Sequence, residues 1–260
     1  MKKPKLVFCD IDGTLIPYGY GGLPEETYSV VRALRERGIG FVLNSGRQYH
    51  SMRVLFSEMP DEIYYIGENG GVVYNCGPEE PTPILRYNEI ERSLALGIAR
   101  SIEAIDGSYC VANDIYTSYC LRSSTELISV LRDGLSNKLD LIDDWDEIRG
   151  PIASMAAYCP HNLEDAESVL RPMWGDKIHM ACAGPTWWDF NNANKGDGLI
   201  ALCEALGVDT ADTVAFGDNW NDVPMLEAAG TGYIMSTSSA ELRALFPNCD
   251  NVLEKLKKYL

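Results

Sequence analysis

The sequence predicts an α/β protein with a doubly wound parallel-sheet core and an α+β unit inserted into that core. Two observations predict this fold. Near both ends of the 260-residue chain, short uninterrupted apolar runs alternate with stretches of helical periodicity, as in parallel sheets covered on both faces. Between them, from about residue 84 to residue 189, helices and strands follow one another in a mixed order.

The elements of the core are predicted from these apolar runs and from helix boundary signals. Residues 6–9, 39–43 and 64–66 are expected to be buried strands. A helix opens at Pro24 and stops at Gly38, and a second covers about 47–58. After the insertion we expect a helix at 198–206, a strand at 213–216 and a short helix at 223–229. This order predicts a core made of residues 1–83 and 190–260.

The inserted unit, residues 84–189, is expected to set substrate specificity. Its pattern predicts a helix, two strands, a helix, a strand, a helix and two strands, with a hairpin formed by 109–111 and 115–117. Pro78, Pro81 and Pro83 mark its entrance. Near its exit stand Trp187 and Trp188, which either close over a ligand or pack at a hinge.

Composition excludes several classes of function. The net charge of −16 opposes binding to nucleic acid or to an anionic membrane surface, but leaves a small anionic substrate open. No apolar run is long enough to span a membrane or to form a signal peptide, so we expect a cytoplasmic protein. The eight cysteines are scattered without a Cys-x-x-Cys pair, which favours reduced, buried thiols. Oligomeric state is left open.

Carboxylates follow two of the predicted strands. Asp10 and Asp12, with Gly13 and Thr14, come directly after the first strand, and Asp218 follows the strand at 213–216. The carboxyl ends of parallel strands meet at one edge of a sheet, where ligands bind. Carboxylates this close repel each other unless a cation lies between them or one of them is protonated, and oxygen ligands suit Mg²⁺. The alternative for the first motif is a solvated acidic turn; an EF-hand does not fit, because its glycine and glutamate spacing differs.

Further polar residues are expected at the same edge. Ser45 and Gly46 follow the second strand and offer a hydroxyl and free amides to a phosphate, or a simple helix cap. Lys195, ahead of the helix at 198–206, is a candidate to neutralise phosphate and carboxylate, although such a lysine is often only solvated. Asn221 and Asp222 follow Asp218, and a plain helix cap is the alternative interpretation for this pair.

These residues together resemble the haloacid dehalogenase superfamily of phosphohydrolases. Its four motifs match residues 10–14, Ser45, Lys195 and residues 217–222. The insertion resembles the type IIB cap of the Cof-like sugar-phosphatase group, and residues 68–71 resemble that group's Asn-Gly-Ala turn. The chain departs from that group at 187–192, before the lysine motif, and at 235–237, so the resemblance does not identify the substrate. The resemblance covers the whole chain and implies a Rossmann-like core.

The resemblance implies a phosphoric monoester hydrolase that acts on a small phosphorylated metabolite, such as a sugar phosphate. Asp10 would be the nucleophile, forming an aspartyl-phosphate, and Asp12 the general acid and base. Mg²⁺ would be held by the Asp10 and Asp218 carboxylates and the Asp12 backbone carbonyl. The remaining motif residues would bind phosphoryl oxygens (Ser45, Gly46, Lys195, Asn221) or support the site from behind (Thr14, Asp222). A phosphosugar mutase and a non-catalytic binding protein are the alternatives.

Overall fold

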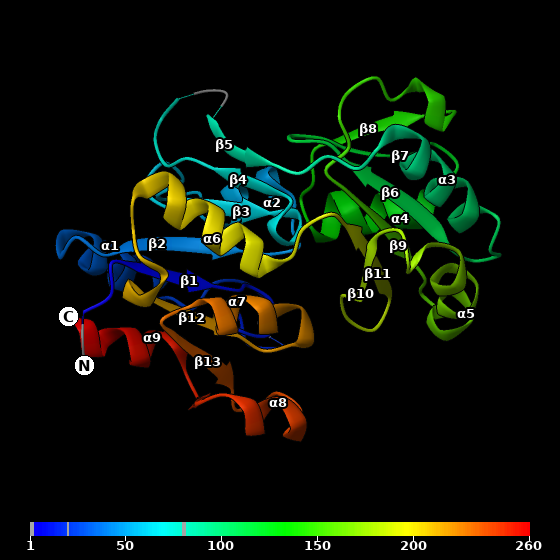
Figure 1. Cartoon of the computed structure of the whole chain (residues 1–260). Coiled ribbons are helices and arrows are strands. Elements are labelled where there is room, and N and C mark those ends of the chain that lie inside the picture. The colour runs from blue at the N-terminus through cyan, green and yellow to red at the C-terminus, as the bar shows by residue number, and fades with distance from the viewer. Residues whose placement is uncertain (1–2, 20, 80–81) are drawn as a thin grey trace. The chain divides into compact units, whose positions relative to one another are not determined.

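The computed structural model describes residues 3–19, 21–79 and 82–260, which form two compact units (Figure 1). The first unit contains the described residues of 1–45, 55–86 and 194–260. The second unit contains residues 46–54 and 87–193. The chain therefore leaves the first unit twice, once for a short segment after β2 and once for the long insertion.

The first unit is built on an eight-stranded sheet with the order β14-β13-β12-β1-β2-β3-β4-β5. The strands from β14 to β3 run parallel, and β4 pairs with β3 in the antiparallel direction. Their bounds are β1 Leu6–Cys9, β2 Gly40–Asn44, β3 Tyr64–Gly67, β4 Val72–Tyr74, β5 Ile84–Tyr87, β12 Thr213–Gly217, β13 Thr231–Met235 and β14 Asn248–Cys249. This is the parallel core that the sequence predicts.

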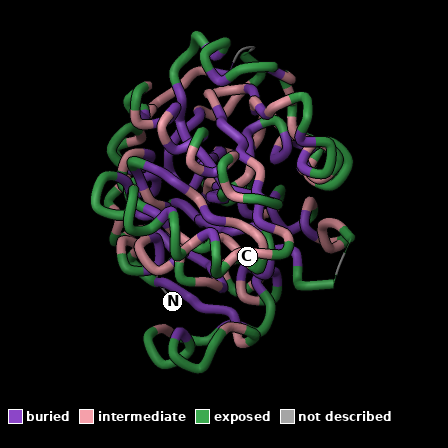
Figure 2. The backbone as a smooth tube through the Cα atoms, turned by 90° about the vertical axis from the view of Figure 1, so that its right-hand side faces the viewer, coloured by how far each residue is buried: buried purple, intermediate pink, exposed green. Residues whose placement is uncertain are grey.

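Helices of the first unit cover the sheet because its strands are apolar on both faces. Leu6 and Phe8 of β1 pack with the buried residues of α6 and α7, while the alternating Val7 and Cys9 are equally buried. Figure 2 shows the buried stretches of the backbone in purple. The helices of this unit are α1 Thr27–Glu36, α6 Lys195–Leu206, α7 Val223–Ala228, α8 Ala240–Leu245 and α9 Val252–Leu256. Burial of β1 on both faces fixes the strand whose end carries Asp10.

The second unit has its own six-stranded sheet, with the order β10-β11-β9-β6-β7-β8. Its strands are β6 Tyr109–Asn113, β7 Ser118–Leu121, β8 Leu139–Ile142, β9 Ser154–Tyr158, β10 His179–Cys182 and β11 Trp187–Asn191. Its helices are α2 Tyr49–Leu55, which ends at the first unit, α3 Arg92–Glu103, α4 Thr125–Ser129 and α5 Leu163–Trp174. A separate hydrophobic core, which includes Ile98, Met155 and Phe190, lies between this sheet and its helices.

The structure corrects three expectations for individual elements. The predicted hairpin strand at 115–117 is a turn, because the Asp114 side chain accepts hydrogen bonds from the Tyr116 and Thr117 N–H groups; the strand is β7. The β8 strand was not expected. Helix α6 begins at Lys195, three residues earlier than predicted, because Asn194 caps it. Pro81, one of the entrance prolines, lies outside the described residues.

The tryptophan pair at 187–188 packs inside the second unit. Trp188 is buried in its hydrophobic core, donates a hydrogen bond to the Leu163 carbonyl at 3.0 Å and lies under the Arg171 guanidinium. Trp187 contacts the Tyr158 ring, with centroids 4.8 Å apart. The packing alternative for Trp188 therefore fits better than closure over a ligand. The boundaries at 84 and 190 and the role of the unit in specificity stay predictions.

Among the described residues, no helix is both long and apolar enough to cross a membrane.

Candidate active site

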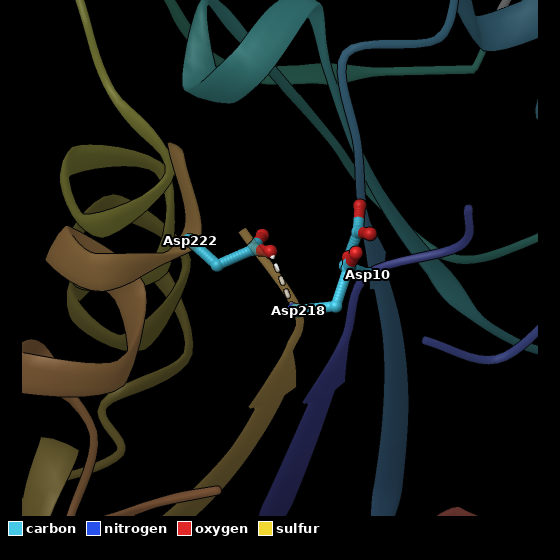
Figure 3. Close-up of side chains that lie close together, drawn as sticks. All are labelled: Asp10, Asp218 and Asp222. Atoms are coloured by element: carbon cyan, nitrogen blue, oxygen red, sulfur yellow. Dashed lines mark hydrogen bonds between the residues drawn. The ribbon is translucent and has the colours of Figure 1, made fainter. Parts of the chain in front are cut away.

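The ends of two neighbouring strands bring the first two carboxylates together. β1 and β12 pair in parallel, and the Asp10 N–H continues the ladder by donating to the Phe216 carbonyl at 3.0 Å. Asp10 and Asp218 each follow the last residue of their strand, so their side chains emerge side by side (Figure 3). Asp222 reaches them from the turn after β12. One carboxylate oxygen from each of the three residues lies within 4.8 Å of the others.

Lys195 is the only lysine that is fully buried in the described part of the chain, and it joins two of these carboxylates. Its Nζ donates to Asp10 Oδ1 and to Asp222 Oδ1, each at 2.6 Å, with 1% of the side chain exposed. The residue stands in the first turn of α6, where Asn194 and Asp197 form a capping box. A lysine merely solvated at a helix entrance is thereby excluded, because this ammonium is enclosed and paired.

Asp222 organises the turn around it. Its second oxygen, Oδ2, accepts hydrogen bonds from the Asp218 and Asn219 N–H groups at 2.9 and 3.0 Å. Gly217 makes this close approach possible, since a Cβ there would lie 2.4 Å from the Asp222 Cβ. Both oxygens of Asp222 thus have protein donors. The side chain caps no N–H of α7, but it closes a capping box with Asn219 at the 3-10 helix Trp220–Asp222, so the helix-cap interpretation holds together with the contact to Lys195.

Asp218 is held from the other side by the loop after β1. Thr14 Oγ1 donates to Asp218 Oδ1 at 3.1 Å and the Tyr18 hydroxyl donates to Oδ2 at 2.8 Å. Gly13 has a φ of +85°, and a Cβ there would lie 2.4 Å from Asp218 Oδ2. Gly13 is therefore needed in the first motif, because any side chain there would clash with the Asp218 carboxylate that follows β12.

The charges of this cluster do not balance within the protein. Three buried carboxylates share one ammonium, and the neighbouring Asp222 adds repulsion to each of the other two. Burial raises the pKa of Asp10 well above its usual range, opposed by Lys195, and burial with the Asp222 charge also raises the pKa of Asp218. Burial alone would lower the pKa of Lys195, but Asp10 and Asp222 raise it, so the ammonium stays charged. A divalent cation fits this excess of negative oxygen ligands.

Family membership follows from comparison of the whole chain. Residues 7–255 match the model of the haloacid dehalogenase-like hydrolases. The chain belongs to this family. The resemblance to this family that the sequence suggested is thus confirmed, and residues from three of its four motifs, Asp10, Lys195 and Asp222, meet in one buried cluster.

Named relatives extend the likeness over nearly the full length. The 5-amino-6-(5-phospho-D-ribitylamino)uracil phosphatase YbjI of Escherichia coli is 24% identical, over 98% of this chain and 96% of that protein. A solved structure from Eubacterium rectale is 29% identical, covers 99% of each chain and has a TM-score of 0.84. The subclass IIB sugar phosphatase BT4131 has a TM-score of 0.82 at 20% identity, over 98% of each chain. The predicted fold class is confirmed, and the fold of this chain resembles that of the subclass IIB protein.

The structure brings together Asp10, Thr14, Lys195, Asp218 and Asp222 of this haloacid dehalogenase-like hydrolase. It brings Ser45 and Asn221 to a common neighbour: the Asn69 N–H donates to the Ser45 carbonyl at 3.0 Å, and Asn221 Nδ2 donates to Asn69 Oδ1 at 3.2 Å.

Two predicted residues stand apart from the buried cluster. The side chain of Asp12 is exposed, outside the group of three buried carboxylates. Gly46 begins the segment that belongs to the second unit. Their assigned roles, like the phosphate-binding roles of Ser45, Lys195 and Asn221, stay predictions.

Three residues of the site were missed from the sequence. Tyr18 stands in a glycine-rich loop that carries no local signal for its contact with Asp218. Asn44, at the end of β2, is fully buried and its Nδ2 donates to the Lys195 carbonyl at 2.9 Å. Asn69 was noted only as part of a turn. A polar residue at the end of a buried strand was the available signal for Asn44, and the spacing of Asn194 and Asp197 was the signal for the start of α6.

Proposed function

We propose that this hydrolase is a Mg²⁺-dependent phosphatase of a small phosphorylated metabolite, most simply a sugar phosphate, and that it works through an aspartyl-phosphate on Asp10. The observation that carries the proposal is the buried Lys195 ammonium, shared by Asp10 and Asp222 beside the unbalanced Asp218 carboxylate. The name of the Escherichia coli relative, which places a phosphate on a ribityl chain, supports a substrate of this size and kind.

The carboxylates of Asp10 and Asp218 and the backbone carbonyl of Asp12 would hold the metal. Asp222 is less suited, because its oxygens already accept three hydrogen bonds, one of them from the Lys195 ammonium, whereas each oxygen of Asp218 accepts one from a neutral hydroxyl. When bound, Mg²⁺ would supply positive charge that draws phosphate to the nucleophile and offsets charge in the transition state. Thr14 and Tyr18 would keep the Asp218 carboxylate aimed at the metal.

The chemical steps are assigned to two aspartates. The Asp10 carboxylate attacks phosphorus, the bond from phosphorus to the leaving oxygen breaks, and Asp12 donates its proton to that oxygen. Asp12 then takes a proton from water, the water oxygen attacks phosphorus, and the bond to Asp10 breaks to release inorganic phosphate. Lys195 favours the ionised form of Asp10 against the effect of burial and orients the carboxylate for attack through its 2.6 Å contact.

The first test compares leaving groups. Asp12→Asn should slow hydrolysis of alkyl phosphates such as sugar phosphates far more than hydrolysis of p-nitrophenyl phosphate, whose leaving group needs no proton. Equal losses of kcat/KM on both substrates would remove Asp12 from acid–base catalysis. Phosphate transfer to a second sugar position, without release of inorganic phosphate, would favour the mutase alternative.

The second test concerns the metal. Chelator-treated protein should lose activity and regain it with Mg²⁺, and Mg²⁺ should raise the Tm of the wild type but not of Asp218→Ala. Asp176→Ala, at an exposed position of the second unit, is the control. Full turnover after metal removal, with no change in Tm on adding Mg²⁺, would exclude the proposed metal site.

The inserted residues 84–189 are proposed to act as a cap that selects the leaving group. Exposed arginines of this unit, Arg122 and Arg149, are candidates to contact a second anionic group. Arg149→Ala and Arg122→Ala should change the ranking of phosphorylated metabolites by kcat/KM while leaving p-nitrophenyl phosphate hydrolysis unchanged. An unchanged ranking in both variants would exclude these two arginines from substrate selection.

A further inference from the structure

The turn between β3 and β4 has an unusual backbone. Glu68, Asn69 and Gly70 have φ values of 54°, 50° and 95°, all in the left-handed region. Within 3–19, 21–79 and 82–260, the only non-glycine residues with positive φ are Glu68, Asn69 and Ser136. Such a conformation is strained for a non-glycine residue, and it persists only where surrounding contacts impose it. Two such residues in succession, both buried, indicate that this turn has a specific task.

Asn69 contacts two of the predicted phosphate-binding segments at once. Its backbone N–H donates to the Ser45 carbonyl at 3.0 Å, and its side-chain Oδ1 accepts from Asn221 Nδ2 at 3.2 Å. Ser45 in turn donates its N–H to the Ile66 carbonyl at 3.0 Å, so the end of β2 is fixed to β3 and to this turn. The turn thereby sets the spacing between Ser45 and Asn221, which come from opposite sides of β1 in the sheet.

Gly70 brings the third segment into contact. A Cβ at this position would lie 2.0 Å from the Asn194 carbonyl oxygen, so the turn packs directly against the residue that caps α6. Lys195 is the next residue. Gly198, one turn further along α6, also packs against this turn, since a Cβ on Gly198 would lie 3.0 Å from the Gly70 Cα. One short turn therefore contacts the segments that carry Ser45, Lys195 and Asn221.

The connection between β3 and β4 does not by itself require this backbone conformation or these contacts. Glycine or a turn of ordinary geometry joins antiparallel strands without buried left-handed Glu and Asn residues. We propose that Asn69 is a positioning residue: its side chain orients the amide of Asn221 toward the phosphoryl group, and the left-handed turn holds Asn69 in place for this purpose. The role rests on the proposed function, because it assumes that Asn221 binds phosphate. An amide has two N–H bonds, so Asn221 can donate one to Asn69 and keep the other for the ligand.

Asn69→Gly distinguishes the contribution of the Asn69 side chain from that of its backbone. Glycine adopts the same left-handed φ at no steric cost and keeps the N–H bond to Ser45, whereas the side chain and with it the contact with Asn221 are removed. In the presence of Mg²⁺, we expect kcat/KM for p-nitrophenyl phosphate to fall about tenfold, as for one lost hydrogen bond, and the dissociation constant for inorganic phosphate to rise by a similar factor. Ser136→Gly, at the positive-φ position in the second unit, should change neither value.

A double-mutant cycle decides whether Asn69 acts through Asn221. Asn221→Ala alone should weaken phosphate binding, and adding Asn69→Gly to it should cause no further loss, because the oriented group is already gone. Losses that multiply in the double variant, or an unchanged phosphate dissociation constant in Asn69→Gly, would overturn the positioning role. A lowered Tm alone would assign Asn69 to stability only.

The phosphate measurement also separates this proposal from the proposed function. If the wild-type protein binds inorganic phosphate but hydrolyses no phosphate ester, the phosphatase assignment fails, while the cycle on phosphate binding still decides the role of Asn69. If the wild type does not bind phosphate at all, both fail. Calorimetric titration of phosphate into the wild type and the three variants therefore comes first.

Discussion

Each unit of the chain buries a polar cluster, and the two clusters differ in charge. In the second unit, neutral side chains form a continuous network, which we call the amide cluster: Gln48 Nε2 donates to Ser118 Oγ at 2.9 Å, Ser118 Oγ to Asn113 Oδ1 at 2.6 Å, and Asn113 Nδ2 to Ser154 Oγ at 2.9 Å. In the first unit, the acidic cluster consists of Asp10, Asp218 and Asp222 with the single ammonium of Lys195.

This difference in charge indicates different roles for the two clusters, one in stability and the other in function. A neutral network in which the side chains hydrogen-bond to one another stabilises the fold without hydrogen bonds to water. A buried cluster with more carboxylates than ammonium groups is destabilising, because the desolvation and mutual repulsion of the carboxylates are not offset by the ion pairs. Such a cost is expected where the charge binds a ligand, so we predict that the acidic cluster is the functional one.

The strongest way to test the contrast is Asp10→Asn. Activity should fall below about a thousandth of the wild-type rate, because an amide is a poor nucleophile. In metal-free buffer the Tm should not fall, since one of three mutually repelling carboxylates is neutralised while Lys195 keeps an acceptor oxygen. Rates on p-nitrophenyl phosphate and thermal melts check both points, with Asp176→Asn as an exposed control. Residual activity well above that level would argue for direct attack by water.

Asp222→Asn, in the same cluster, should lower the Tm, unlike Asp10→Asn. The Asp222 oxygens accept hydrogen bonds from Lys195 and from two backbone N–H groups. In the asparagine variant, the side-chain NH₂ group would face one of these donors. Breaking such a buried pair costs about 3–5 kcal/mol, which should appear as a markedly lower Tm together with lost activity. If Asp222→Asn melted like the wild type, Asp222 would not be the organiser of this turn.

Ser118→Ala tests the amide cluster. Ser118 is fully buried and its hydroxyl meets Gln48, Asn113 and Asn137, so its loss leaves buried donors and acceptors unpaired. We expect the free energy of unfolding to fall by about 1–3 kcal/mol, while kcat on p-nitrophenyl phosphate stays near the wild-type value. Ser123→Ala, exposed in the same unit, is the matched control for denaturant unfolding. A large loss of kcat with wild-type stability would contradict the division between the two clusters.

The smallest effect is expected from Glu103, a partly buried carboxylate of the second unit. Burial raises its pKa, opposed by the hydrogen bond that it accepts from the Cys110 N–H. Because the folded-state pKa lies above the unfolded one, its contribution to stability is present below the ordinary glutamate pKa and is lost as pH rises through the folded-state value.

Glu103→Gln keeps the acceptor for Cys110 but removes the charge. Its Tm relative to the wild type should therefore increase as the pH rises from about 4 to 7. Glu204→Gln, at an exposed position of α6, should show no such trend. A Tm difference that stays constant over this range would show that Glu103 titrates alike in both states.

The sequence by itself determined the parallel core and the polar residues at its strand ends. Apolar runs such as 6–9 and 213–216 are strands whatever their neighbours, since only burial on both faces accommodates them. Asp10 and Asp218 were predicted to meet because parallel strands place their carboxyl ends at one edge, and Lys195 was a candidate because it accompanied these motifs. Local chemistry and topology were sufficient for these residues.

Only the tertiary structure decided the partners within that edge. Nothing near Tyr18 or Asn44 in the sequence points to Asp218 or Lys195, because these contacts join segments about 150–200 residues apart. The same holds for Asn69, whose left-handed backbone depends on Ser45, Asn221 and Asn194 arriving from three different elements. Trp188 likewise had two equal interpretations until the core of the second unit enclosed it. Hydrogen bonds and steric contacts act over a few ångströms in space, so separation along the chain hides them until the fold is known.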